Sequence, residues 1–129
     1  MTLKQYKDYF KTSFNWNEAI SIGKIDNGKE KAICFYNSKR TLAPTKAIDK
    51  SSYKIKPITI LLRYTKNQDT AEQMAISIYK FFDERIFKIG ENQVKTQHFY
   101  EDPINLGTDD EGVYEYSLEI NFIEERLEE

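Results

Sequence analysis

The stretch GTDDEGVYEYSLEINF, residues 107–122, combines a turn with the most regular strand pattern in the chain. Apolar side chains occupy every second position from Tyr114 to Phe122, and acidic or polar side chains lie between them. Because side chains alternate between the two faces of a strand, this pattern predicts a strand with one apolar and one polar face. Residues 109–112 are typical of a turn, since glycine accepts positive φ and aspartate hydrogen-bonds its own backbone. The apolar face of such a strand needs a covering element elsewhere in the chain.

The spacing of apolar residues predicts that covering element as a helix over residues 70–89. Apolar side chains recur there at intervals of three and four positions. Thr70 and Gln73 form a capping-box pattern at its start, and Gly90 supplies a stop at its end. A helix of about 20 residues is about 30 Å long, which is enough to cross a small sheet.

The remaining segments predict a second helix and further strands. A short amphipathic helix is expected over residues 3–14, and strands are expected over 18–25, 31–36, 53–64 and 94–100, with a short extended piece at 104–106. Residues 26–29 predict a hairpin between the first two strands, because Asn-Gly supplies the positive φ values of a tight turn. Pro57 predicts a bulge or a sheet edge. These elements predict one α+β domain over residues 1–129, a mostly antiparallel sheet of four to five strands with two helices packed on one face.

The composition is that of a globular protein outside the membrane. A hydrophobic share of 40% supplies a core, whereas no apolar run approaches the ~18–20 residues of a membrane span. The first residues carry no signal-peptide pattern. The single cysteine, Cys34, lies in an apolar strand pattern and is expected to be a buried thiol. We therefore expect a protein that folds in the cytosol.

Charge is distributed unevenly along the chain. Residues 24–66 contain eleven Lys and Arg and three Asp and Glu, whereas residues 67–129 contain five and sixteen. This uneven charge distribution has two interpretations. In the first, the charges belong to solvated faces that are segregated by chance. In the second, they form two surfaces of opposite sign, suited to self-association or to two different partners. Residues 37–52 form a long basic connection without predicted structure, and such connections often bind partners.

Sequence motifs for catalysis or cofactor binding are lacking. His98 is the single histidine, and its proximity in sequence to Asp102 does not by itself make a catalytic dyad. The acidic cluster at 109–111 lacks the alternating spacing of a calcium loop and is better interpreted as a charged turn. The chain has no phosphate-binding glycine loop or nucleophile motif. We therefore expect no catalytic, cofactor-binding or metal-binding residues and no enzyme activity.

Three quoted segments, taken in order, resemble a family of phage minor capsid proteins of the tail-terminator type. They are ISIGKIDNGKEKAICFYNSKR, YKIKPITILLRYTKNQDTAEQMAISIY and GTDDEGVYEYSLEINF, of which the last is the most specific. The resemblance covers most of the chain from about Glu18. It implies an α+β protein that forms a ring, commonly hexameric, at the head-proximal end of the tail tube. That ring stops tube polymerisation and helps to join tail to head, without catalysis or cofactor.

The resemblance further implies the partners and location of the protein. The partners would be further copies of the chain, the tail-tube protein and the head-connector protein, and DNA would pass through the ring without specific binding. The location would be the virion, at the tail or the head–tail junction, after assembly in the host cytoplasm or expression from a prophage.

The charge pattern predicts which residues contact a neighbouring subunit or the tail tube. On the basic side these are Lys39, Arg40, Lys46 and Lys50, and on the acidic strand they are Glu115, Glu119 and Asn121. Three alternatives stay open. They are another neck or minor capsid component, a nucleic-acid-binding domain that uses residues 24–66, and a small enzyme that uses His98 with Asp102.

Overall fold

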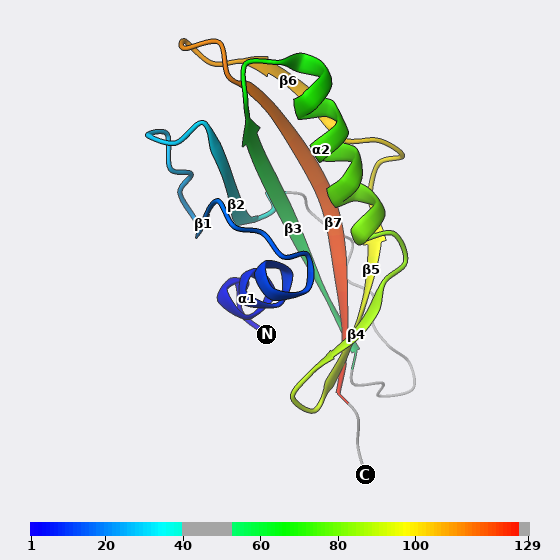
Figure 1. The fold of residues 1–129 in the computed structure, drawn as a ribbon. Coiled ribbons are helices and arrows are strands. Elements are labelled where there is room, and N and C mark those ends of the chain that lie inside the picture. The colour runs from blue at the N-terminus through cyan, green and yellow to red at the C-terminus, as the bar shows by residue number, and fades with distance from the viewer. Residues whose placement is uncertain (40–52, 127–129) are drawn as a thin grey trace.

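The computed structural model describes residues 1–39 and 53–126, with only the backbone of Arg126. The described residues form two helices and seven strands (Figure 1). In chain order these are α1 (Leu3–Ser13), β1 (Ala19–Ile22), β2 (Lys31–Asn37), β3 (Tyr53–Tyr64), α2 (Gln68–Phe81), β4 (Ile86–Ile89), β5 (Asn92–His98), β6 (Ile104–Thr108) and β7 (Tyr114–Arg126). The predicted α+β class and the predicted strand at 114–122 are confirmed.

The strands form one mixed sheet organised around β7. Its order is β1-β2-β3-β7-β5-β4, and β6 also pairs with β7. On one side β7 pairs with β3 in an unbroken antiparallel ladder from Arg63–Glu115 to Tyr53–Glu125. On its other side β7 pairs first with β6 and then with β5. The prediction of four to five strands was therefore too small, because β4 was assigned to a helix and β6 only to an extended piece.

The predicted hairpin between the first two strands is wrong, because β1 and β2 pair in parallel. Ala19 lies opposite Ala32, and Ile22 lies opposite Phe35. The chain turns away at Gly23, whose φ is 75°, and travels back along the sheet before β2 begins. A turn does form at 26–29, where the Asp26 side chain accepts from the Gly28 N–H, but Gly28 does not take positive φ. The connection is long enough to reverse the chain twice, so the sheet is mixed.

The predicted helix over 70–89 is confirmed in its first part and wrong in its last. α2 starts at an Asn67 cap, whose side chain accepts from the Thr70 N–H, and ends at Phe81. Glu84 then takes a φ of 47°, and the following residues form β4, which pairs with β5. Gly90 turns this β4–β5 hairpin with a φ of 60°. The Ile-Phe-Lys-Ile sequence of β4 fits both the apolar spacing of a helix and that of a strand. Its pairing with β5 makes it a strand.

Pro57 lies at a sheet edge rather than at a bulge. The β3–β7 ladder passes through Pro57, opposite Asn121, without a register shift. On the other side of β3, pairing with β2 ends at Ile58, which lies opposite Asn37. The Pro57 carbonyl still accepts from the Ser38 N–H at 3.1 Å, and among the described residues β3 is paired only with β7 from Lys56 to Tyr53. Proline suits this last position of the ladder, because it has no N–H to contribute beyond it.

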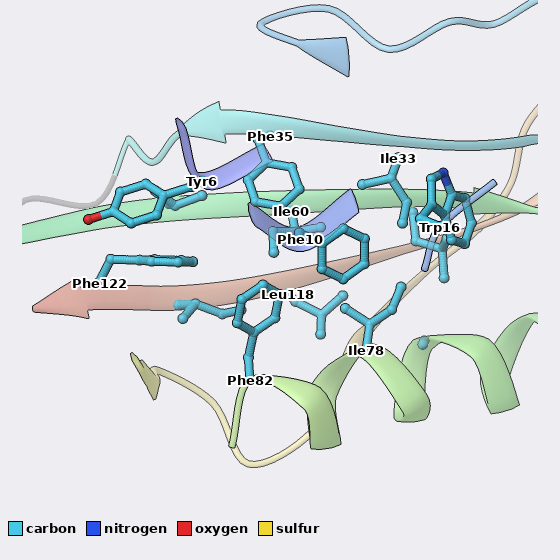
Figure 2. Close-up of a cluster of buried hydrophobic side chains, with 14 of the residues drawn as sticks. Tyr6, Phe10, Trp16, Ile33, Phe35, Ile60, Ile78, Phe82, Leu118 and Phe122 are labelled. Atoms are coloured by element: carbon cyan, nitrogen blue, oxygen red, sulfur yellow. The ribbon is translucent and has the colours of Figure 1, made fainter. Parts of the chain in front are cut away.

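Both helices pack on the same face of the sheet, as predicted. Figure 2 shows α1 side chains and α2 side chains meeting over β2, β3 and β7. Phe10 of α1 is fully buried and lies at the centre of this layer. Its ring stacks on Phe14 and Phe82, with ring centroids 4.8 and 5.6 Å apart, and it also contacts Phe35 and Trp16. α1 and α2 are thus held together by aromatic contacts above the strands.

We predict that Phe10→Ala lowers the free energy of unfolding by about 3–5 kcal/mol, because it removes a fully buried aromatic ring and leaves a cavity. Urea unfolding followed by circular dichroism measures this loss. Ile86→Ala is the matched control, because Ile86 is 59% exposed and should change stability by less than about 0.5 kcal/mol. Equal losses for the two variants would contradict the central position of Phe10.

Candidate interaction surfaces

The acidic and polar residues of β7 lie on the sheet face opposite the helices. Tyr116, Leu118, Ile120 and Phe122 point into the core, so the residues between them point to the other face. Glu115, Glu119 and Asn121 are half-buried on that face, and Ser117 is buried. The prediction of one apolar and one polar face is confirmed, but the polar face is not fully open to water.

Glu119 accepts several side-chain hydrogen bonds on this face. Its carboxylate accepts from the Thr59 hydroxyl at 2.9 Å, from the Ser38 hydroxyl at 3.1 Å and from the Ser117 hydroxyl at 3.2 Å. These donors come from β3, from the end of β2 and from β7 itself. Such contacts hold the carboxylate in one position and tie β2 to the centre of the sheet.

A surface hollow brings together residues from both predicted interaction sites. It is lined by Tyr36, Asn37, Ser38, Lys39, Thr59 and Glu119. Lys39 is exposed and comes from the basic segment, whereas Glu119 comes from the acidic strand. Of the other basic residues predicted to bind a partner, Arg40, Lys46 and Lys50 lie outside the described residues.

Glu115 and Asn121 do not line this hollow. Glu115 lies in register with Arg63 on one side and Gly107 on the other. Asn121 lies between Pro57 and Gln97. Its side-chain oxygen is enclosed, and no hydrogen bond reaches it from the residues that the structure describes. The predicted acidic site is thus spread along the strand.

Arg63 forms an ion-pair cluster that sequence reasoning missed. Its side chain is 2% exposed, pairs with Asp109, and lies 3.4 Å from the Glu111 carboxylate. Its Nε also donates to the Lys29 carbonyl at 2.8 Å. Asp109 in turn accepts from the N–H groups of Glu111 and Val113, which shapes the β6–β7 turn. Arg63 lies on the polar side of its strand pattern, which is only a weak indication that the side chain has a structural role. Nothing in the sequence indicated that this side chain is buried.

The acidic turn is therefore a structural element. Within the described parts of the chain, no group of three or more His, Cys, Asp or Glu side chains could hold a metal ion. The interpretation of residues 109–111 as a charged turn is confirmed by the Asp109 hydrogen bonds.

His98 is held by an aromatic neighbour and not by Asp102. Its ring stacks on Tyr79 with centroids 3.5 Å apart, and its Nε2 lies 2.8 Å from the Tyr79 carbonyl. Burial lowers the pKa of His98 below its usual 6.5, against opposing effects of that carbonyl and of Asp83. Its described hydrogen bond goes to the backbone of α2, so the geometry is that of a packing residue.

Comparison with known protein families was made over the whole chain. A family model described as bacteriophage tail terminator protein matches residues 11–126. This chain belongs to that family. No curated protein and no solved structure matches it. The resemblance inferred from the three quoted segments is confirmed, and it places the protein among the structural proteins of phage tails. No helix within the described residues of this tail-terminator family member is long and apolar enough to cross a membrane.

We predict that Arg63→Met lowers the free energy of unfolding by about 2–3 kcal/mol, because it leaves the Asp109 carboxylate without its partner. This loss is smaller than for a fully buried ion pair, since Asp109 is 23% exposed. The control is Glu111→Gln, which should cost less than about 1 kcal/mol because Glu111 is 72% exposed. A double-mutant cycle of Arg63→Met with Asp109→Asn, measured by urea unfolding, isolates the pair. A coupling energy of zero would show that Arg63 acts through packing alone.

We predict that the free energy of unfolding decreases as pH falls below about 6.5, because the lowered pKa of folded His98 lets the unfolded state bind more protons. His98→Gln should remove the part of this decrease that begins below about pH 6.5, since the chain has one histidine. Asp102→Asn is the control and should keep the wild-type pH dependence. A flat wild-type profile would contradict the burial of the neutral imidazole.

Proposed function

We propose that this protein forms a ring that caps the head-proximal end of the phage tail tube, stops its polymerisation and helps to join tail to head. The observation that carries the proposal is the family match over residues 11–126. The protein acts as a structural, non-enzymatic component of the virion, at the tail or the head–tail junction. Its partners are further copies of itself, in a hexameric ring, together with the tail-tube and head-connector proteins.

The surface features are compatible with binding between unlike patches. Closed rings use heterologous contacts, in which one patch of a subunit meets a different patch of the next. The hollow beside Lys39 and Glu119 offers both charges at one place, and Glu119 is already fixed by three hydroxyl groups. A preorganised carboxylate loses little conformational freedom when a partner binds.

The direct test is polymerisation of purified tail-tube protein with and without this protein. We expect tubes to stop growing when the protein is added, and electron microscopy should show a ring at one tube end. Mass measurement then gives the number of subunits. If tube length is unaffected and the protein instead binds the isolated connector protein, the protein is another neck or minor capsid component. Salt-sensitive DNA binding without tube binding would support the nucleic-acid alternative.

We predict that replacing Lys39, Arg40, Lys46 and Lys50 with Ser weakens ring formation and tube capping but leaves the fold intact. The physical reason is the loss of four positive charges that face an acidic patch on the partner. The matched control replaces the exposed Lys11, Lys80, Lys88 and Lys95 with Ser, which changes net charge equally. Circular dichroism checks the fold, and unchanged capping by the first variant would overturn this assignment.

A further inference from the structure

The turn at residues 26–29, in the connection between β1 and β2 (Figure 1), contains the one Asn-Gly pair of the chain. The sequence has eight asparagines, and only Asn27 is followed by glycine. In such a pair the backbone nitrogen of the glycine can approach the side-chain amide of the asparagine closely, because glycine has no side chain to block it. The sequence therefore distinguishes Asn27 chemically from the other seven asparagines.

The turn is held at both ends and is open to water in the middle. Ahead of it, the Ile25 N–H donates to the Tyr36 hydroxyl at 3.0 Å. Behind it, the Lys29 carbonyl accepts from the Nε of the buried Arg63 at 2.8 Å. Asn27 and the glycine after it are exposed. Within the described part of the chain, no hydrogen bond holds the Asn27 side chain, so its amide is accessible.

Asp26 contacts the backbone nitrogen next to this amide. Its Oδ1 accepts from the Gly28 N–H at 3.0 Å. The Lys29 N–H donates to the Asp26 carbonyl at 3.4 Å, so the hydrogen bond that closes the turn is long. A backbone nitrogen can attack a carbonyl only as its proton leaves, and a carboxylate at hydrogen-bond distance can accept that proton. The turn therefore holds a nucleophile and a base beside one exposed side-chain amide.

We propose that Asn27 is a site of spontaneous deamidation, for which the chain itself supplies the nucleophile and the base. The Gly28 nitrogen forms a bond to the carbon of the Asn27 side-chain amide, while Asp26 takes the proton from that nitrogen. The C–N bond of the side-chain amide then breaks, and its nitrogen takes up the proton and leaves as ammonia. Water opens the resulting cyclic imide at either carbonyl, which gives aspartate or isoaspartate at position 27. The reaction needs no partner and is independent of the proposed ring.

Both products change the connection between β1 and β2. Each adds one negative charge between Lys24 and Lys29, in the segment where basic residues outnumber acidic ones. Isoaspartate also adds one carbon to the backbone, which changes the spacing between the hydrogen-bonded groups of Ile25 and Lys29. Because the Lys29 carbonyl binds Arg63, this change reaches the ion-pair cluster at the β6–β7 turn.

Mass spectrometry of protein stored in neutral buffer tests the proposal. Trypsin releases residues 25–29 as one peptide, because Lys24 and Lys29 flank it. This peptide should gain the difference in mass between water and ammonia, about 1 Da, and should separate into two forms on chromatography. The peptides that carry the other asparagines are internal controls and should stay unchanged over the same time. An unmodified Asn27, or earlier modification of another asparagine, would overturn the proposal.

Two matched variants test the role of Asp26 in the folded protein. Asp26→Asn keeps an oxygen that accepts from the Gly28 N–H but cannot take up its proton, so deamidation of Asn27 should slow by at least about tenfold. Fragmentation of the peptide locates the modified residue, because the variant carries one more asparagine. Asp110→Asn is the control, since Asp110 is an exposed acid outside this turn and its loss should leave the rate unchanged. If Asp26→Asn reacts as fast as the wild type or faster, Asp26 is not the base.

Discussion

The antiparallel ladder between β3 and β7 is the interaction on which the rest of the structure depends. It joins the longest strands and lays Ile58, Ile60 and Leu62 beside Ile120, Leu118 and Tyr116. This pairing creates the apolar surface on which both helices pack. β2 and β5 extend this surface, because each pairs with one of these two strands. The same ladder places Glu115 and Glu119 together on the other face.

Local patterns were sufficient where one face of an element is apolar and the other is polar. This is why residues 114–122 and 3–14 were predicted as a strand and a helix. The prediction failed where a short apolar segment fits two periods, as at residues 86–89, and where pairing depends on distant partners. The parallel register of β1 with β2 is such a case, since Asn27-Gly28 is a hairpin signal that the surrounding sheet overrides.

At the candidate interaction surfaces, too, local patterns predicted some features, whereas others depend on contacts between distant parts of the chain. The outward direction of Glu115, Glu119 and Asn121 follows from alternation and was predictable. The burial of Arg63 was not, because it depends on the β6–β7 turn folding back over β3 to bring Asp109 within reach. The segregation of charge along the sequence is therefore partly used inside the subunit. β3 of the basic segment lies beside β7 of the acidic one, and Arg63 neutralises part of the acidic turn.

Arg63 also ties two connections of the sheet to each other. It binds the Lys29 carbonyl in the connection that follows β1, and it binds Asp109 in the turn that follows β6. Two residues further along the chain, the Thr65 N–H donates to the Glu30 carbonyl, and the Thr65 carbonyl accepts from the Tyr114 N–H. These bonds form a cross-brace at one end of the molecule. In a closed ring of identical subunits, a braced subunit spans a fixed angle, and that angle sets both the number of subunits and the diameter of the central opening.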